Sequence, residues 1–414
     1  MADYRNNHYV PEWYQYRFFP DCANEKKFYY LDLAPDVAIN NGKRYQRKAL
    51  LRWGPPRCFR ERDLYTTRLG AWESTEIEQK FFGQIDSSCR TAFDYFANFE
   101  HPGANPEAFN KFLLYMSLQK MRTPKGLVEL SRLINLSDKN HVLIEMQRLR
   151  QLYCALWTEC IWSIADATES DTKFIISDHP VTVYNQACFP HSRWCRGHQD
   201  PDIWLSGTHT LFPLDLNKLL ILTNLSWVRN PYGSPLKNRP NPQPFRHAMF
   251  NFLQIQTGRN LSEEEVNEIN YVIKQRAYRY IAAQQEEWLY PEKHVRSIHW
   301  NKLGSGYLFM PDPRSVSFST ETIIGYKDGR ADAFDEYGRK PWEEGYTGEQ
   351  LVQKEWNTFH AFQGEFARVF GPKRRGRAFE FGKIDDVEDS ADFHAYHLRL
   401  EQKFKPKNAR KIRR

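Results

Sequence analysis

The sequence lacks long apolar runs, a leader segment and the short catalytic signatures by which many protein classes are recognised. No stretch approaches the roughly 20 apolar residues of a membrane-spanning helix, and the N-terminus MADYRNNHYV lacks a basic segment followed by an apolar one. Gly-x-Gly-x-x-Gly, a Walker-type Gly-Lys-Ser/Thr, Gly-x-Ser-x-Gly and His-Glu-x-x-His are absent. Hydride transfer on a Rossmann fold, nucleotide-dependent phosphoryl transfer and α/β-hydrolase chemistry are therefore not expected.

The cysteines do not indicate a disulfide framework. There are 7 of them, an odd number, and they are scattered along 414 residues. Together with the absence of a leader, this predicts reduced thiols and a cytoplasmic protein.

Length and charge predict one large domain followed by an extension. Single cores usually stop growing at about 250–300 residues, so we expect a main domain over 1–300, a docked extension over 301–400 and a basic, disordered tail over 401–414. Residues 371–414 hold 13 Lys/Arg against 7 Asp/Glu, which leaves the rest of the chain near neutral although the total is +7. Nucleic acid is therefore a candidate partner of the tail, and a solvated terminus is the alternative. No membrane partner is expected, and the oligomeric state cannot be predicted.

Apolar periodicity predicts an α+β fold. The expected class is a large, mainly helical layer packed on a small, mostly antiparallel sheet, with a helical C-terminal extension. Helices are expected near 75–96, 106–123, 141–165, 263–280 and 347–370, and strands near 28–33, 173–177, 181–184, 210–214 and 219–223, with edge strands at 306–310 and 315–318. A basic loop is expected over 42–62, because Gly54-Pro55-Pro56 disfavours regular structure.

Three polar residues are candidates for a catalytic site. His8 precedes the rigid Tyr9-Val10-Pro11 segment and is suited to proton transfer near neutral pH, although a histidine near a terminus is more often a surface or packing residue. Arg122 ends a predicted helix, where it either stabilises the helix dipole or binds a carboxylate or phosphate. Asp178 follows a predicted strand in Ser177-Asp178-His179-Pro180, which forms either a turn or part of a site.

A second candidate site has the spacing of metal ligands. Cys188, His191, Cys195 and His198 form the pattern Cys-x-x-His-x-x-x-Cys-x-x-His. Zinc takes two cysteines and two histidines as tetrahedral ligands. Only three residues separate the two pairs, whereas zinc fingers have a much longer loop, so a polar loop with incidental thiols is the alternative.

Several segments together resemble a known family, domain of unknown function 4238. The resemblance spans roughly 5–285 and is carried by these segments: His8-Tyr9-Val10-Pro11, Trp13-Tyr14, Arg17-Phe18, Glu78, Arg122-Thr123-Pro124, Phe174 to Val181, Phe212-Pro213-Leu214, Asn270 and Arg276 to Tyr280. It implies an α+β domain without settled biochemistry, and it draws attention to His8, Arg122 and Asp178. Asp215 departs from the Ser-Pro expected after Phe-Pro-Leu, and the Cys/His loop has no place in the family pattern.

Two functional hypotheses follow. The first is a hydrolase acting on a phosphodiester or nucleic acid, with His8 as general acid or base, Asp178 as orienting group or cation ligand and Arg122 as stabiliser of negative charge. The second is a non-catalytic nucleic-acid or ligand-binding regulatory protein, in which these side chains form a structural network.

Overall fold

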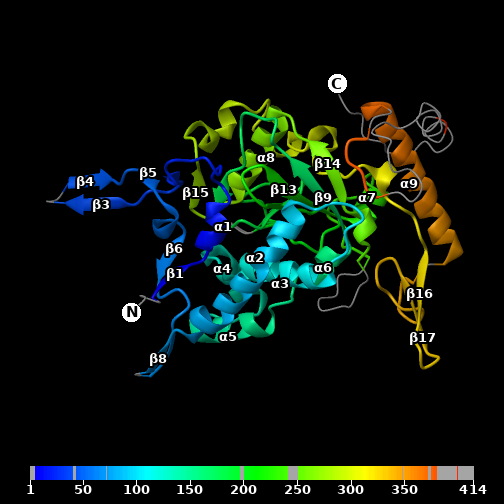
Figure 1. Cartoon of the computed structure of the whole chain (residues 1–414), viewed down its shortest axis with the longest axis horizontal. Coiled ribbons are helices and arrows are strands. Elements are labelled where there is room, and N and C mark those ends of the chain that lie inside the picture. Colours follow the sequence, from blue (N-terminus) through cyan, green and yellow to red (C-terminus); the bar gives the residue numbers. More distant parts are fainter. Residues whose placement is uncertain are drawn as a thin grey trace.

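A computed structural model describes residues 5–40, 43–70, 72–195, 200–240, 250–346, 348–371, 374–379 and 399. The α-helices are α1 (Glu12–Tyr16), α2 (Gly83–Ala97), α3 (Pro106–Arg122), α4 (Pro124–Leu133), α5 (Lys139–Arg148), α6 (Cys154–Thr158), α7 (Leu225–Arg229), α8 (Glu263–Arg276) and α9 (Glu349–Phe370). A π-helical segment, Ile77–Phe82, leads directly into α2. Helices and several small sheets are both present, which confirms the α+β class (Figure 1).

The central sheet has five strands. In spatial order they are β11 (Thr182–Tyr184), β12 (His209–Pro213), β13 (Lys218–Asn224), β9 (Cys160–Asp166) and β14 (Gln256–Asn260). Neighbouring strands are antiparallel, except that β14 runs parallel to β9. Nearly every residue of β9, β12 and β13 is buried, so both faces of the sheet are covered.

A second sheet joins distant parts of the chain. Its four antiparallel strands are, in order, β10 (Ile176–Ser177), β15 (Tyr280–Ala283), β2 (Phe28–Asp32) and β5 (Leu50–Trp53). This sheet places the N-terminal strands beside the strand that follows α8.

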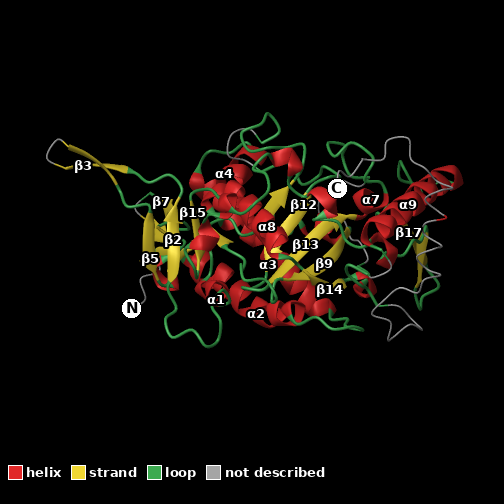
Figure 2. Cartoon of the chain, turned by 90° about the horizontal axis from the view of Figure 1, so that it is seen from above, coloured by secondary structure: helices red, strands yellow, loops and turns green. Residues whose placement is uncertain are grey.

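Aromatic side chains join the helices to the central sheet. Trp162 of β9 contacts the rings of Phe96, Phe109 and Phe112 on α2 and α3. Phe212 of β12 contacts Tyr14 and rings of the same two helices. Figure 2 shows α2 and α3 running alongside these strands. Among the described residues, no helix is both long and apolar enough to cross a bilayer.

Two sequence signals set the helix boundaries near the candidate site. Asn105 caps α3 by accepting a hydrogen bond from the Ala108 N–H, and Pro106 occupies the first helical position. Pro124 has no N–H to continue α3, so Thr123 takes an extended conformation and caps α4 by accepting from the Gly126 N–H. Ser262 and Glu265 form the capping box of α8.

Two predictions of local structure are wrong. The helix predicted over 141–165 ends at Arg148, and a short α6 then precedes β9. Because β9 is buried on both faces, its apolar residues fit a helical period as well as a strand. The predicted edge strands at 306–310 and 315–318 instead contain the 3₁₀ turns Ser305–Tyr307 and Pro313–Ser315.

The segment predicted as a basic loop is also mostly ordered into strands. It contains β4 (Lys43–Gln46), β5 and β6 (Arg60–Arg62), and only Pro55–Arg57 forms a 3₁₀ turn. β4 pairs with β3 (Val37–Asn40) in a hairpin that projects from the body (Figure 1). Further two-stranded pairs join β1 (Asn6–His8) to β6, β7 (Thr67–Leu69) to β8 (Trp72–Ser74) and β16 (Glu321–Gly325) to β17 (Ala331–Asp335).

The C-terminal helix α9 packs against α7 in a second, smaller hydrophobic core. Phe359, Phe362 and Phe366 of α9 are buried in a cluster with Trp227 and Val228 of α7. Thr347, the predicted start of this helix, and the basic tail 401–414 lie outside the described residues. The domain boundaries at 300 and 400 remain predictions.

Candidate functional site

His8 lies at the end of β1 and is bonded locally. Its Nε2 lies 3.3 Å from the carbonyl oxygen of Pro56, and its Nδ1 lies 3.5 Å from Glu12 Oε1. Burial lowers the pKa of the imidazole, and Glu12 partly offsets this effect. These contacts account for the orientation of the His8 ring, and no catalytic role is needed to explain it.

Arg122 is buried at the end of α3. Its Nη1 donates to both carboxylate oxygens of Asp86, at 3.0 and 3.1 Å, and its Nε donates to Gln119 Oε1 at 2.7 Å. Gln119 in turn donates to the Tyr9 carbonyl at 2.9 Å. The backbone beside His8 is thus linked to Arg122 through one glutamine.

Asp178 is buried beneath the turn that leads into β15. Its carboxylate accepts hydrogen bonds from the backbone N–H groups of Tyr278, Arg279 and Tyr280, at 2.6–2.8 Å. Burial raises the pKa of Asp178 to about 6, against the opposing effect of these three donors. Among the described residues, no hydrogen bond or ion pair joins any two of His8, Arg122 and Asp178, so the structure brings their segments near one another but gives each side chain separate partners.

The Cys/His loop does not form a metal-ligand set in its described part. Cys188 and Cys195 are buried, His191 is exposed, and Cys195 Sγ accepts from Arg276 Nη1 at 3.2 Å. Burial raises the pKa of the Cys188 thiol to about 12. His198 lies outside the described residues, so the four-ligand site remains a prediction.

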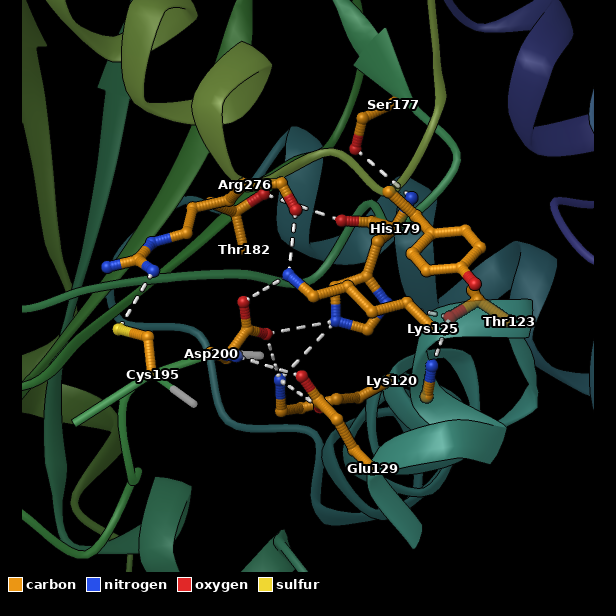
Figure 3. Close-up of polar contacts among 12 residues, drawn as sticks. Lys120, Thr123, Lys125, Glu129, Ser177, His179, Thr182, Cys195, Asp200 and Arg276 are labelled. Carbon is orange, nitrogen blue, oxygen red and sulfur yellow. Dashed lines mark hydrogen bonds and ion pairs between the residues drawn. The ribbon is translucent and has the colours of Figure 1, made fainter. Parts of the chain in front are cut away.

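A buried cluster of charged groups lies between α3, α4, the turn after β10 and the start of a loop at Asp200 (Figure 3). Lys120 Nζ donates to Asp200 Oδ2 at 2.7 Å, and Lys125 Nζ donates to Oδ1 at 2.5 Å. The three side chains are only 3–4% exposed. Burial alone would raise the pKa of Asp200, but the two ammonium groups hold it well below its usual value. Asp200 is therefore ionised at neutral pH.

The turn between α3 and α4 brings both lysines to the same carboxylate. A Cβ on Gly126 would lie 2.0 Å from the Lys120 carbonyl oxygen, so only glycine permits α4 to start this close to α3. Lys125 also donates to the Arg276 carbonyl at 2.8 Å, which joins the cluster to the end of α8.

His179 connects this carboxylate to a hydroxyl group. Its Nε2 lies 3.1 Å from Asp200 Oδ2, and its Nδ1 lies 2.7 Å from Thr123 Oγ1. Because Asp200 is ionised, the ring donates its Nε2–H to the carboxylate and accepts the Thr123 proton at Nδ1. Burial lowers the pKa of His179, so the ring is neutral and can accept that proton. A carboxylate, an imidazole and a hydroxyl in this order form a proton-transfer chain.

The same cluster contains residue types that can bind a metal ion. Across the described stretches, Glu129, His179 and Asp200 form the one group of three ligand residues whose donor atoms lie within 4.8 Å of one another. The Lys120 ammonium occupies this position, at 2.7 Å from Asp200 Oδ2, 3.5 Å from His179 Nε2 and 3.8 Å from Glu129 Oε2. Burial would lower the pKa of Lys120, but Asp200 and Glu129 raise it. The residues therefore fit an ammonium group rather than a metal ion.

The buried cluster involves two segments that the sequence had singled out, but it uses other side chains than those predicted. Thr123 and His179 each directly follow a predicted site residue, Arg122 and Asp178. The Pro124 break and the spacing of Lys120 and Lys125 were the available signals. No pattern in the sequence indicated Asp200.

The chain matches a known protein family over most of its length. The model described as "Protein of unknown function (DUF4238)" matches residues 6–287, more than half of the chain, and includes every member of the buried cluster. No curated protein and no solved structure matches the chain.

Proposed function

The chain belongs to the DUF4238 family of proteins of unknown function, and we propose that this member is a cytoplasmic hydrolase of phosphodiesters in which Thr123 is the nucleophile, His179 the base and Asp200 the orienting group. The observation that carries the proposal is the position of His179, which lies 2.7 Å from a hydroxyl and 3.1 Å from an ionised carboxylate. The seven cysteines are all free thiols, which supports a reducing compartment.

In the proposed reaction, protons enter and leave His179 at Nδ1, while its Nε2–H stays bonded to Asp200. Thr123 Oγ1 attacks phosphorus and transfers its proton to His179 Nδ1, and Asp200 stabilises the imidazolium. The leaving oxygen takes that proton. Water then attacks the phosphothreonine, gives a proton to Nδ1 and releases the phosphate monoester, and Thr123 regains its hydrogen.

The two lysines would position and polarise the proton-transfer chain of Thr123, His179 and Asp200. By holding Asp200 ionised, Lys120 and Lys125 keep its oxygens as acceptors for the Nε2–H. Lys120 Nζ also lies 3.5 Å from the ring, so it is near enough to oppose a lasting positive charge on His179. Solvent reaches the cluster at Glu129, whose side chain is 16% exposed.

The predicted roles of His8, Arg122 and Asp178 remain proposals of lower rank. Each has structural partners that explain its position, as described above. They hold the segments around the cluster in place, because Arg122 precedes Thr123 and Asp178 precedes His179.

A non-catalytic binding protein with a structural polar network is the second candidate. Its support is that Thr123 and His179 are fully buried and that the charged cluster contains as many lysines as carboxylates. Such a network would fix the α3–α4 corner to the turn after β10 without any turnover.

The two candidates are separated by replacing the hydroxyl of Thr123. We expect wild type to hydrolyse bis(p-nitrophenyl) phosphate or labelled oligonucleotides, Thr123→Val to lose at least about 100-fold in kcat, and Thr123→Ser to retain activity. Thr172→Val is the matched control, because Thr172 is a buried threonine that donates to Glu263 and is not part of the cluster. Equal rates for Thr123→Val and wild type, or no turnover by wild type on either substrate, would leave only the binding hypothesis.

A further inference from the structure

One short part of the chain carries a charge excess as large as that of the whole protein. Residues 43–68 contain nine Lys/Arg and two Asp/Glu, a net of +7, and the formal charge of all 414 residues is also +7. These residues form β4, β5, β6, the first two residues of β7 and the connections between these strands. We call this segment the basic arm.

All nine cations of the basic arm are exposed. Arg52 and Arg68 have acidic partners, in Glu25 and in Asp63 and Glu73. Within the described parts of the chain, the other seven make no ion pair; they are Lys43, Arg44, Arg47, Lys48, Arg57, Arg60 and Arg62. A folded chain gains nothing from concentrating unpaired like charges, so this arrangement points to an anionic partner.

The β3–β4 hairpin carries apolar groups beside these cations. Val37 and Ile39 are 58% and 69% exposed. Ile39 pairs with Arg44, and Val37 pairs with Gln46, so these four side chains share one face of the ribbon. The hairpin projects away from the body in both views (Figures 1 and 2). An isolated two-stranded ribbon is marginally stable by itself, and a partner that packs on it would stabilise it.

Charge and shape together define the partner. A row of unpaired cations neutralises a polyphosphate backbone and releases its counterions. A two-stranded ribbon is narrow enough to enter the major groove of a duplex, and exposed apolar residues on such ribbons insert between base steps in minor-groove binders. We propose that the basic arm binds double-stranded nucleic acid, with the β3–β4 hairpin in a groove and the cations of β4 and β6 on the phosphates.

This inference is independent of the proposed hydrolysis. Binding through the arm needs no reaction at Thr123, so Thr123→Val should bind a duplex as tightly as wild type.

The test is fluorescence anisotropy of the full chain with a labelled DNA duplex of about 25 base pairs. The arm variant is Lys43→Gln, Arg44→Gln, Arg47→Gln and Lys48→Gln combined. The control variant combines Arg132→Gln, Arg150→Gln, Lys302→Gln and Lys327→Gln, which are exposed cations outside the arm. We expect the arm variant to weaken binding at least about tenfold near 50 mM salt and to reduce the slope of log K against log salt by roughly 3, with the control within about twofold of wild type.

Three results would overturn the proposal. The first is equal weakening by the arm and control variants, which would indicate a diffuse charge effect. The second is unchanged duplex affinity in the arm variant. The third is arm-dependent binding to vesicles of anionic phospholipid without binding to the duplex, which would assign the apolar and basic face to a membrane surface.

Discussion

The buried cluster at Lys120 and the basic arm both contain cationic side chains, yet their charges have opposite surroundings. In the cluster, each ammonium group lies within 2.7 Å of an oxygen of Asp200, and water is almost excluded. In the arm, seven of nine cations make no ion pair with any residue that the structure describes, and all nine are exposed. The first set of charges is neutralised within the fold, and most of the second set is not.

The difference predicts which variable each region responds to. Exposed charges are screened over about 10 Å at 0.1 M salt, so interactions of the arm should depend strongly on ionic strength. Buried pairs are screened much less, and the cluster contains a histidine whose pKa is lowered by burial. The cluster should therefore respond to pH and the arm to salt.

The largest effect is expected from removing the charge at the centre of the cluster. Asp200→Asn keeps the shape of the side chain but leaves two buried lysines without their carboxylate, and we expect the free energy of unfolding to fall by about 3–5 kcal/mol. Urea titration followed by tryptophan fluorescence measures this loss. Asp328→Asn is the control, because Asp328 forms an exposed pair with Arg330 and should change stability by less than about 1 kcal/mol. Similar losses in the two variants would show that the cluster is not a buried network.

A smaller effect is expected from pH. Burial lowers the pKa of His179 in the folded state, so below about 6.5 the unfolded chain takes up a proton that the folded chain does not. Stability contributed by the neutral ring is present above that pH and is lost as pH falls toward the folded pKa, by about 1.4 kcal/mol per pH unit.

The measurement is the slope of unfolding free energy against pH between about 6.5 and 5. His179→Gln should make this slope smaller than in wild type. The reduction should be at most about 1.4 kcal/mol per pH unit, which corresponds to one bound proton. His141→Gln, at a histidine whose side chain is 70% exposed, should leave it unchanged. An unchanged slope in His179→Gln would mean that the folded and unfolded proteins take up the His179 proton over the same pH range, so burial would not lower the pKa of this ring.

Elements with local signals could be predicted from the sequence, whereas elements defined by tertiary burial could not. Asn105-Pro106 and the Ser262/Glu265 box gave correct starts for α3 and α8, because capping depends on neighbouring residues. β9 was predicted as helix, because a strand covered on both faces has no alternation of polar and apolar residues.

The contrast between local signals and tertiary contacts also explains which parts of the candidate sites could be predicted. Arg122-Thr123-Pro124 and Ser177 to Pro180 were recognised as distinctive, and the cluster does lie at these two segments. Asp200 enters from a third segment with no local pattern, so its contact with Lys120 and Lys125 depends on the fold. The basic arm was predicted as a loop because of Gly54-Pro55-Pro56, although the Lys43–Gln46 strand lies before that break and its charges were visible in the sequence.

The smallest effect is expected at the apolar residues of β3, the strand that pairs with β4 of the basic arm. The double variant Val37→Thr, Ile39→Thr keeps the branched β-carbons that favour a strand. It removes no core contact, because both side chains are more than half exposed. The free energy of unfolding should therefore change by no more than about 0.5 kcal/mol. Val183→Thr places a hydroxyl group in the fully buried strand β11 and should cost about 1–3 kcal/mol by itself. Thermal unfolding of the two variants measures both values. If the double change in the hairpin cost as much as the single change in β11, Val37 and Ile39 would be covered by protein in the folded state, and the face assigned to a nucleic-acid groove would already be in use.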